Sequence, residues 1–147
     1  MQKNLVGIIV ILLALSLPFN AFSKSEETAK AMPESSQPMD SGNGWKLVKT
    51  LEMGKSGKFI HIVLIDHDKY TDKTIYSAVI FKFCRDEQDF CRIRFWSQER
   101  YIPEKASLTT EQNKQLKAEY TVNKAAGIHQ LRWSCSIDPD KSHCFSH

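Results

Sequence analysis

The chain has 147 residues, of which 41% are hydrophobic and 25% are charged, and its formal net charge is +3. Nucleic-acid-binding domains usually carry a stronger positive charge, with Lys and Arg clustered on one surface. Here acidic residues interrupt the basic ones, notably between residues 66 and 89. The sequence therefore predicts no nucleic-acid partner.

The first 23 residues have the organisation of a cleavable secretory signal peptide. Lys3 supplies a positive start, residues 5–17 form an apolar run, and Ala21-Phe22-Ser23 places small residues before a cleavage position. A spanning helix needs about 20 apolar residues, more than this run offers, and a retained anchor is the alternative interpretation. We expect a periplasmic or secreted protein with no stable membrane anchor after cleavage.

Residues 24–43 are rich in Ser, Glu and Pro and contain no aromatic residue. Such a composition buries too little apolar surface to compensate for the entropy lost on ordering, so we expect a flexible polar linker. Residues 44–147 remain for a single domain of roughly 100 residues, which is enough for one hydrophobic core.

A β-hairpin is predicted at the start of this domain. Apolar and polar residues alternate over residues 45–53, which is the period of a strand. Residues 54–57 have the composition of a turn. Residues 59–65 are apolar on both faces apart from His61, as is typical of a central strand covered on both sides.

A helix is predicted over residues 72–84, with Thr71 or Asp72 as its cap. A strand over the same residues is the alternative. The apolar residues that would share one side of the helix are Ile75, Tyr76, Val79, Ile80 and Phe83.

A second helix is predicted after Thr109. Thr109 and Gln112 have the spacing of a capping box. The helix would carry Leu116 and Tyr120 on one side and end near Asn123.

Alternation predicts two more strands, over residues 91–96 and, after a break at Gly127, over residues 131–135. The resulting order is β-β-α-β-α-β. This order predicts a small α+β domain with an antiparallel sheet of about four strands and two helices on one face.

The four cysteines all lie in the predicted domain, and an even number of cysteines in an exported chain indicates disulfides. Three pairings are possible. We favour two short loops, since each favoured pair brackets a polar, turn-rich segment, and the spacings do not match a zinc or redox C-x-x-C motif. The favoured pairs are Cys84–Cys91 and Cys135–Cys144.

A basic surface is the candidate binding site. Arg92, Arg94 and Trp96 share one side of a predicted strand, and Arg132 lies on another strand. If the two strands pair, these side chains could bind an anionic ligand through bidentate guanidinium contacts. Alternatively, the long Arg side chains simply cover the outer face of the sheet.

Two further groups could support hydrolysis or metal binding. His67 stands between Asp66 and Asp68 at the end of a predicted strand, where a carboxylate could tune an imidazole for acid–base chemistry. The second group is a C-terminal tail with Asp138, Asp140, His143, Cys144 and His147. A polar loop and a frayed tail are the alternatives, and no known hydrolase motif is present, so we predict neither a catalytic residue nor a cofactor.

Several cysteine and aromatic positions resemble a pattern in small uncharacterised secreted or periplasmic bacterial proteins. The pattern comprises Asp89-Phe90-Cys91, Phe95-Trp96, and Trp133-Ser134-Cys135 with Cys144. The resemblance implies export and a disulfide-bonded domain, and it implies no activity. We therefore expect an exported, non-catalytic binding protein for an envelope protein or an anionic envelope component, with a small hydrolase or metal-binding protein as the alternative.

Overall fold

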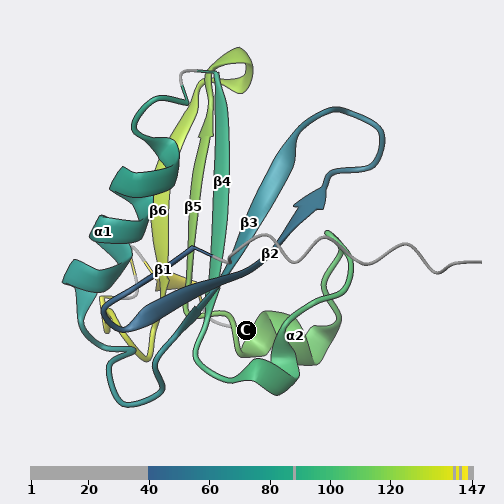
Figure 1. Ribbon diagram of the computed structural model, residues 1–147. Helices are drawn as coiled ribbons and strands as arrows, with labels where there is room; N and C mark the ends of the chain where they lie inside the picture. The colour runs from purple at the N-terminus through teal and green to yellow at the C-terminus, as the bar shows by residue number, and fades with distance from the viewer. Residues whose placement is uncertain (1–39, 88, 141, 143, 146–147) are drawn as a thin grey trace, which may run out of the picture. The chain divides into compact units, whose positions relative to one another are not determined.

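The computed structural model describes residues 40–87, 89–140, 142 and 144–145. The predicted signal peptide and residues 24–39 of the predicted linker lie outside these residues. In this described part of the chain, a seven-stranded sheet and one long helix dominate the fold (Figure 1). The elements are β1 (Ser41–Gly42), β2 (Trp45–Glu52), β3 (Phe59–Ile65), α1 (Lys73–Cys84), β4 (Phe90–Trp96), η1 (Glu99–Tyr101), α2 (Thr110–Lys114), β5 (Ala118–Asn123), η2 (Lys124–Ala126), β6 (Ile128–Ser134) and β7 (Cys144–Phe145).

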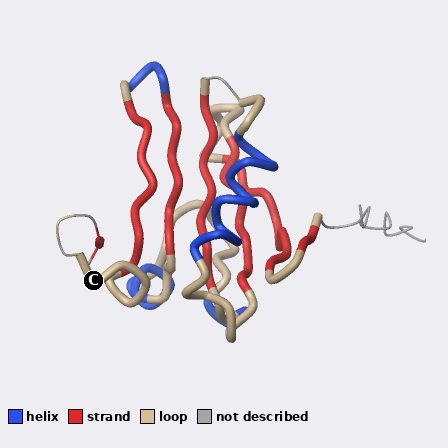
Figure 2. Tube along the Cα trace, turned by 90° about the vertical axis from the view of Figure 1, so that its left-hand side faces the viewer, coloured by secondary structure: helices blue, strands red, loops and turns tan. Residues whose placement is uncertain are grey.

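The strands are arranged in the sheet in the same order as in the chain. Most neighbours are antiparallel, but β3 pairs with β4 and β6 pairs with β7 in parallel. Parallel neighbours need a crossover connection, and α1 provides it between β3 and β4. Figure 2, viewed from the side of α1, shows the helix lying over the middle strands.

The prediction of an antiparallel sheet of about four strands with two helices on one face is therefore wrong. The sheet is mixed and larger, and α1 is the single long helix of the described residues. The capping box of Thr109 and Gln112 is present, but α2 ends after five residues. The rest of the predicted second helix, from Ala118, is strand β5.

Strand alternation explains this outcome. Ala118, Tyr120 and Val122 all contact the core beneath α1, as every second residue of a strand does. A helix over the same residues would keep Ala118 and Val122 on one side but would turn Tyr120 to the opposite side. The intervening Glu119 projects from the opposite face of the sheet and binds side chains of β4.

The predicted helix over residues 72–84 is confirmed. Asp72 is its N-cap, and its side chain accepts a hydrogen bond of 2.9 Å from the backbone N–H of Thr74. Tyr76 is fully buried, with its ring packed against Phe95 and Trp133. This packing joins α1 to the first core, on one face of the sheet.

A second core lies on the other face and consists of Ile60, Ile62, Trp96 and Leu116. The segment from η1 through α2 covers it, and the Trp96 indole N–H donates a hydrogen bond of 2.9 Å to the carbonyl of Gln112. The prediction that β3 is covered on both faces is thus confirmed. Each face of β3 contributes to a different core.

A bulge in β2 allows this strand to serve both cores. The pairing of β2 with β3 shifts register between Leu47 and Lys49. Leu47 consequently packs against the first core, whereas Leu51, four residues later, packs against the second. Without the extra residue, both side chains would point to the same face.

Strand β1 lies at the end of the predicted linker and pairs with the start of β2. Gly44 joins the two strands with a φ of +82°, a conformation that side chains rarely adopt. A Cβ at Gly44 would also lie 2.6 Å from Ile75 on α1. The tight turn therefore requires glycine at this position.

Both favoured disulfides are confirmed. Cys84–Cys91 ties the end of α1 to β4, with 5.6 Å between the Cα atoms. Cys135–Cys144 ties the residue after β6 to β7, with a Cα–Cα distance of 5.0 Å. Disulfides of this kind are typical of proteins that fold in oxidising compartments.

Candidate functional site

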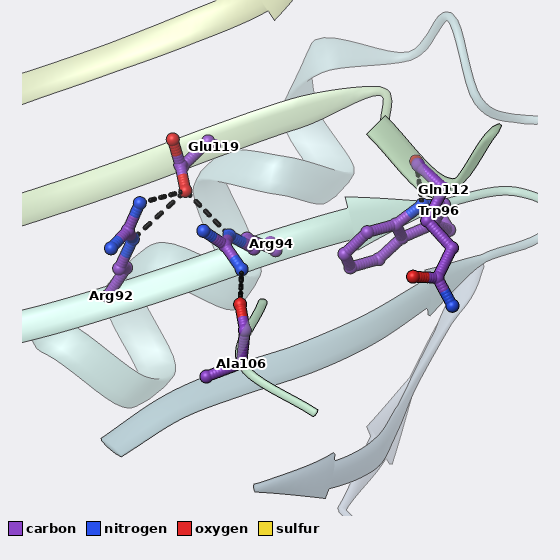
Figure 3. A network of polar contacts seen from close by, with 6 residues as sticks. All are labelled: Arg92, Arg94, Trp96, Ala106, Gln112 and Glu119. Carbon is purple, nitrogen blue, oxygen red and sulfur yellow. Dashed lines mark hydrogen bonds and ion pairs between the residues drawn. The ribbon is translucent and has the colours of Figure 1, made fainter. Parts of the chain in front are cut away.

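The predicted arginine surface contains an internal ion-pair network (Figure 3). Arg92 donates hydrogen bonds of 2.9 and 2.6 Å to Oε1 of Glu119, and Arg94 donates one of 2.7 Å to the same oxygen. Arg94 also donates a bond of 2.6 Å to the carbonyl of Ala106. The two guanidinium groups thus hold β5 and the segment after η1 against β4.

Burial and charge together explain the electrostatics of this network. The Glu119 side chain is only 13% exposed, and burial alone would raise its pKa. The hydrogen bonds and charges of Arg94 and Arg92 outweigh burial, so the pKa of Glu119 lies below its usual value. Burial lowers the pKa of Arg94, although the bond to Glu119 opposes this shift. The network is an ionised, mainly structural connection between strands.

The remaining two predicted binding residues lie in different surroundings. Arg132 is exposed on β6, directly across from Glu119, and its guanidinium lies 5.2 Å from the centre of the Phe145 ring. Trp96 is fully buried in the second core. The structure thus brings Arg92, Arg94 and Arg132 to one face of the sheet but places Trp96 in the interior.

The His67 group does not form a joint site. Asp66 forms a 3.3 Å ion pair with Lys69, and the His67 ring stacks against Tyr70 with 6.0 Å between ring centres. In the tail, Asp138 pairs with Lys73 at 2.9 Å. His143 and His147 lie outside the described residues. Within the residues that are described, His, Cys, Asp and Glu form no group of three or more that could hold a metal ion.

A cleft that sequence reasoning missed lies near the beginnings of β3 and β4. It has a volume of about 470 Å³. The hairpin of β2 and β3 diverges from β4 at this end of the sheet (Figure 1). The cleft is lined by Thr50, Gly57, Lys58, Phe59, His61, Glu87, Asp89, Phe90 and Cys91.

The wall of the cleft combines aromatic and charged side chains. The Phe59 side chain is 48% exposed, and few other large apolar side chains of the described residues are exposed to this extent. The ammonium of Lys58 lies 5.2 Å from the centre of the Phe90 ring. Glu87 and Asp89 are exposed and come from the loop that the Cys84–Cys91 disulfide closes.

His61 is the titratable group of the cleft with the most restricted surroundings. Its Nδ1 lies 3.2 Å from Oγ1 of Thr50, and its ring stacks on Phe83 with 5.0 Å between ring centres. Burial lowers the pKa of His61, while the charge of Glu87 acts in the opposite direction. The imidazole is therefore neutral at pH 7 and contributes a flat, uncharged surface.

Apolar walls with a few polar groups are characteristic of binding sites. The sequence offers only an aromatic residue, Phe59, soon after a predicted turn, and the cleft itself depends on two strands that diverge in space. Comparison with protein-family models, with curated proteins and with solved structures finds no match for this chain. Among the described residues, no helix has the length and apolar character needed to cross a membrane.

Proposed function

We propose that this chain is an exported, non-catalytic binding protein that holds an extended segment of an envelope protein in the cleft between β3 and β4. Export is supported by the signal-like first 23 residues and by the two disulfides. The periplasm or the extracellular space is the corresponding location.

The observation that carries the proposal is the short pairing between β3 and β4. Their ladder joins His61–Leu64 to Ile93–Trp96 and does not reach the first residues of either strand. Each strand therefore presents a backbone edge beside the cleft. Such edges bind extended peptides by adding a strand to the sheet.

The hydrogen bonds that β4 makes toward β5, and those that β3 makes toward β2, show which backbone groups are left to face the cleft. The carbonyl of Asp89 accepts a bond from Lys124, at the β5 side. Since backbone groups alternate sides along a strand, those of Phe90 and Arg92 face β3. The carbonyl of Lys58 likewise accepts a bond from Met53, at the β2 side, so the backbone groups of Phe59 face β4.

The wall of the cleft supports binding rather than catalysis. By strand alternation, Phe59 lies on the face of the sheet that α1 covers and Phe90 lies on the opposite face, so a bound segment can make apolar contact on either side. The Nδ1 atom of His61 is engaged with Thr50, and the ring is stacked and neutral. A bound segment would gain main-chain hydrogen bonds from the edges and side-chain contacts from the aromatic wall.

The experiment is a selection from a library of random extended peptides displayed on phage, with the disulfide-bonded protein as bait. Selected peptides should bind the wild-type protein and lose about tenfold in affinity when Phe59→Ser removes an aromatic contact. Phe81→Ser is the matched control, because Phe81 is even more exposed but lies on α1 outside the cleft. A selection that yields no binding peptide would contradict the proposal. Peptides that bind the Phe59→Ser variant as tightly as the Phe81→Ser variant would also contradict it.

A further inference from the structure

The charges around the cleft indicate the kind of segment that it holds. Glu87 and Asp89 lie on the same loop, and both carboxylates are exposed. Neither side chain has an ion-pair partner within 4.0 Å among the described residues. Other exposed carboxylates, such as Glu99 and Glu104, do pair with a lysine.

The basic residue of the cleft does not neutralise this pair. The ammonium of Lys58 lies over the Phe90 ring, where a cation–π contact holds it. His61 adds no positive charge at neutral pH, because burial lowers its pKa. The lining residues therefore carry two negative charges and one positive charge.

The apolar surface lies beside these carboxylates. Phe59 and Phe90 line the same cleft as Glu87 and Asp89. A strand places its alternate side chains on one face, about 7 Å apart. Phe59 shares its face of the sheet with His61, on which the charge of Glu87 acts. One bound segment can therefore direct an apolar side chain to Phe59 and the next same-face side chain toward the carboxylates.

We infer that the cleft selects extended segments in which an apolar residue stands two positions from a Lys or Arg. This inference rests on the proposed function and adds the chemistry of the partner. Complementary charge at an exposed rim contributes more to selectivity than to affinity. The cleft should therefore bind segments without the basic residue, but less tightly.

The test uses the same library of random displayed peptides against three baits. Peptides selected on the wild-type protein should be enriched in Lys and Arg two positions from an apolar residue. The Glu87→Lys/Asp89→Lys double variant should instead enrich Asp and Glu at that position. Glu104→Lys/Glu111→Lys is the matched control, since both residues are exposed and lie outside the cleft, and it should select the same basic peptides as the wild type.

A second measurement uses milder substitutions, so that a difference in folding between the baits cannot account for the enrichment. One selected basic peptide should bind at least about tenfold more tightly to the wild type than to Glu87→Gln/Asp89→Asn, with a smaller difference at high salt. Peptides that bind in a Phe59-dependent manner without basic enrichment would overturn this inference and leave the proposed function intact. An absence of Phe59-dependent peptides would overturn both.

Discussion

Arg94 and Glu119 lie directly opposite each other on β4 and β5, and a hydrogen bond of 2.7 Å joins Nε of Arg94 to Oε1 of Glu119. Both side chains are nearly buried, at 11% and 13% exposure. Each charge in such surroundings depends on its partner, because a buried charge without a counter-ion destabilises the folded state.

Glu119→Gln tests this dependence. The change leaves Arg92 and Arg94 without their shared counter-ion, so the free energy of unfolding should fall by about 2–4 kcal/mol. Glu104→Gln breaks an ion pair in which the carboxylate is 82% exposed, and it should change the same quantity by less than about 0.5 kcal/mol. Urea denaturation measures both variants. Equal effects would show that the Glu119 network is no more important than a surface ion pair.

Trp96→Ala distinguishes a core residue from a surface binding residue. Trp96 is fully buried and bonds to the carbonyl of Gln112, so its removal should cost about 3–5 kcal/mol of stability. Phe81→Ala, at a side chain that is 62% exposed, should cost less than about 1 kcal/mol. Thermal and urea unfolding both report the difference. A Trp96 variant as stable as the Phe81 variant would argue that the second core is not formed.

Replacing each disulfide by serines separates stability from binding. Each bond closes a short loop, so Cys84→Ser/Cys91→Ser and Cys135→Ser/Cys144→Ser should each lose about 2–3 kcal/mol of stability. The first pair holds the loop with Glu87 and Asp89 at the cleft. Only the first double variant should therefore bind a selected peptide more weakly. Calorimetric titration below the unfolding temperature of both variants makes this comparison, and equal loss of binding in the two would contradict it.

His61 should make the domain less stable in mild acid. Its pKa in the folded protein lies below the usual 6.5, so the unfolded chain takes up a proton at a higher pH than the folded domain does. Stability should consequently fall as the pH decreases from 6.5 through the pKa of the folded state. An NMR titration of the imidazole and urea unfolding at several pH values provide the measurement. His61→Gln should remove this part of the pH dependence, and an identical pH profile for the variant would contradict the assignment.

Local sequence signals predicted the parts of the fold that neighbouring residues determine. The start of α1, where Asp72 is one of the two predicted caps, the turn before β3 and both disulfide pairs belong to this class. The capping box at Thr109 was also correct, but it marks where a helix begins and says nothing about where the helix ends. The alternation from Ala118 to Val122 favours a strand over a continued helix. The strand forms because those side chains complete the first core.

Other features depend on contacts between distant residues. The bulge in β2 sends Leu47 and Leu51 to different cores, although their spacing fits uninterrupted alternation. Glu119 was not recognised as the partner of Arg92 and Arg94, since a helix was expected there. The cleft arises from the divergence of β3 and β4, which no local pattern encodes.

Amide hydrogen exchange with and without a selected peptide tests the central claim most directly. The backbone N–H groups of Phe59 and Arg92 face the cleft beyond the β3–β4 ladder, so both should exchange rapidly in the free protein. A bound segment that adds to these edges should slow their exchange at least about tenfold, while the amides of Ala125 and Ala126 in the exposed η2 turn stay unchanged. Peptide binding that leaves both amides unprotected, or that protects a different edge of the sheet, would contradict the placement of the binding site in this cleft.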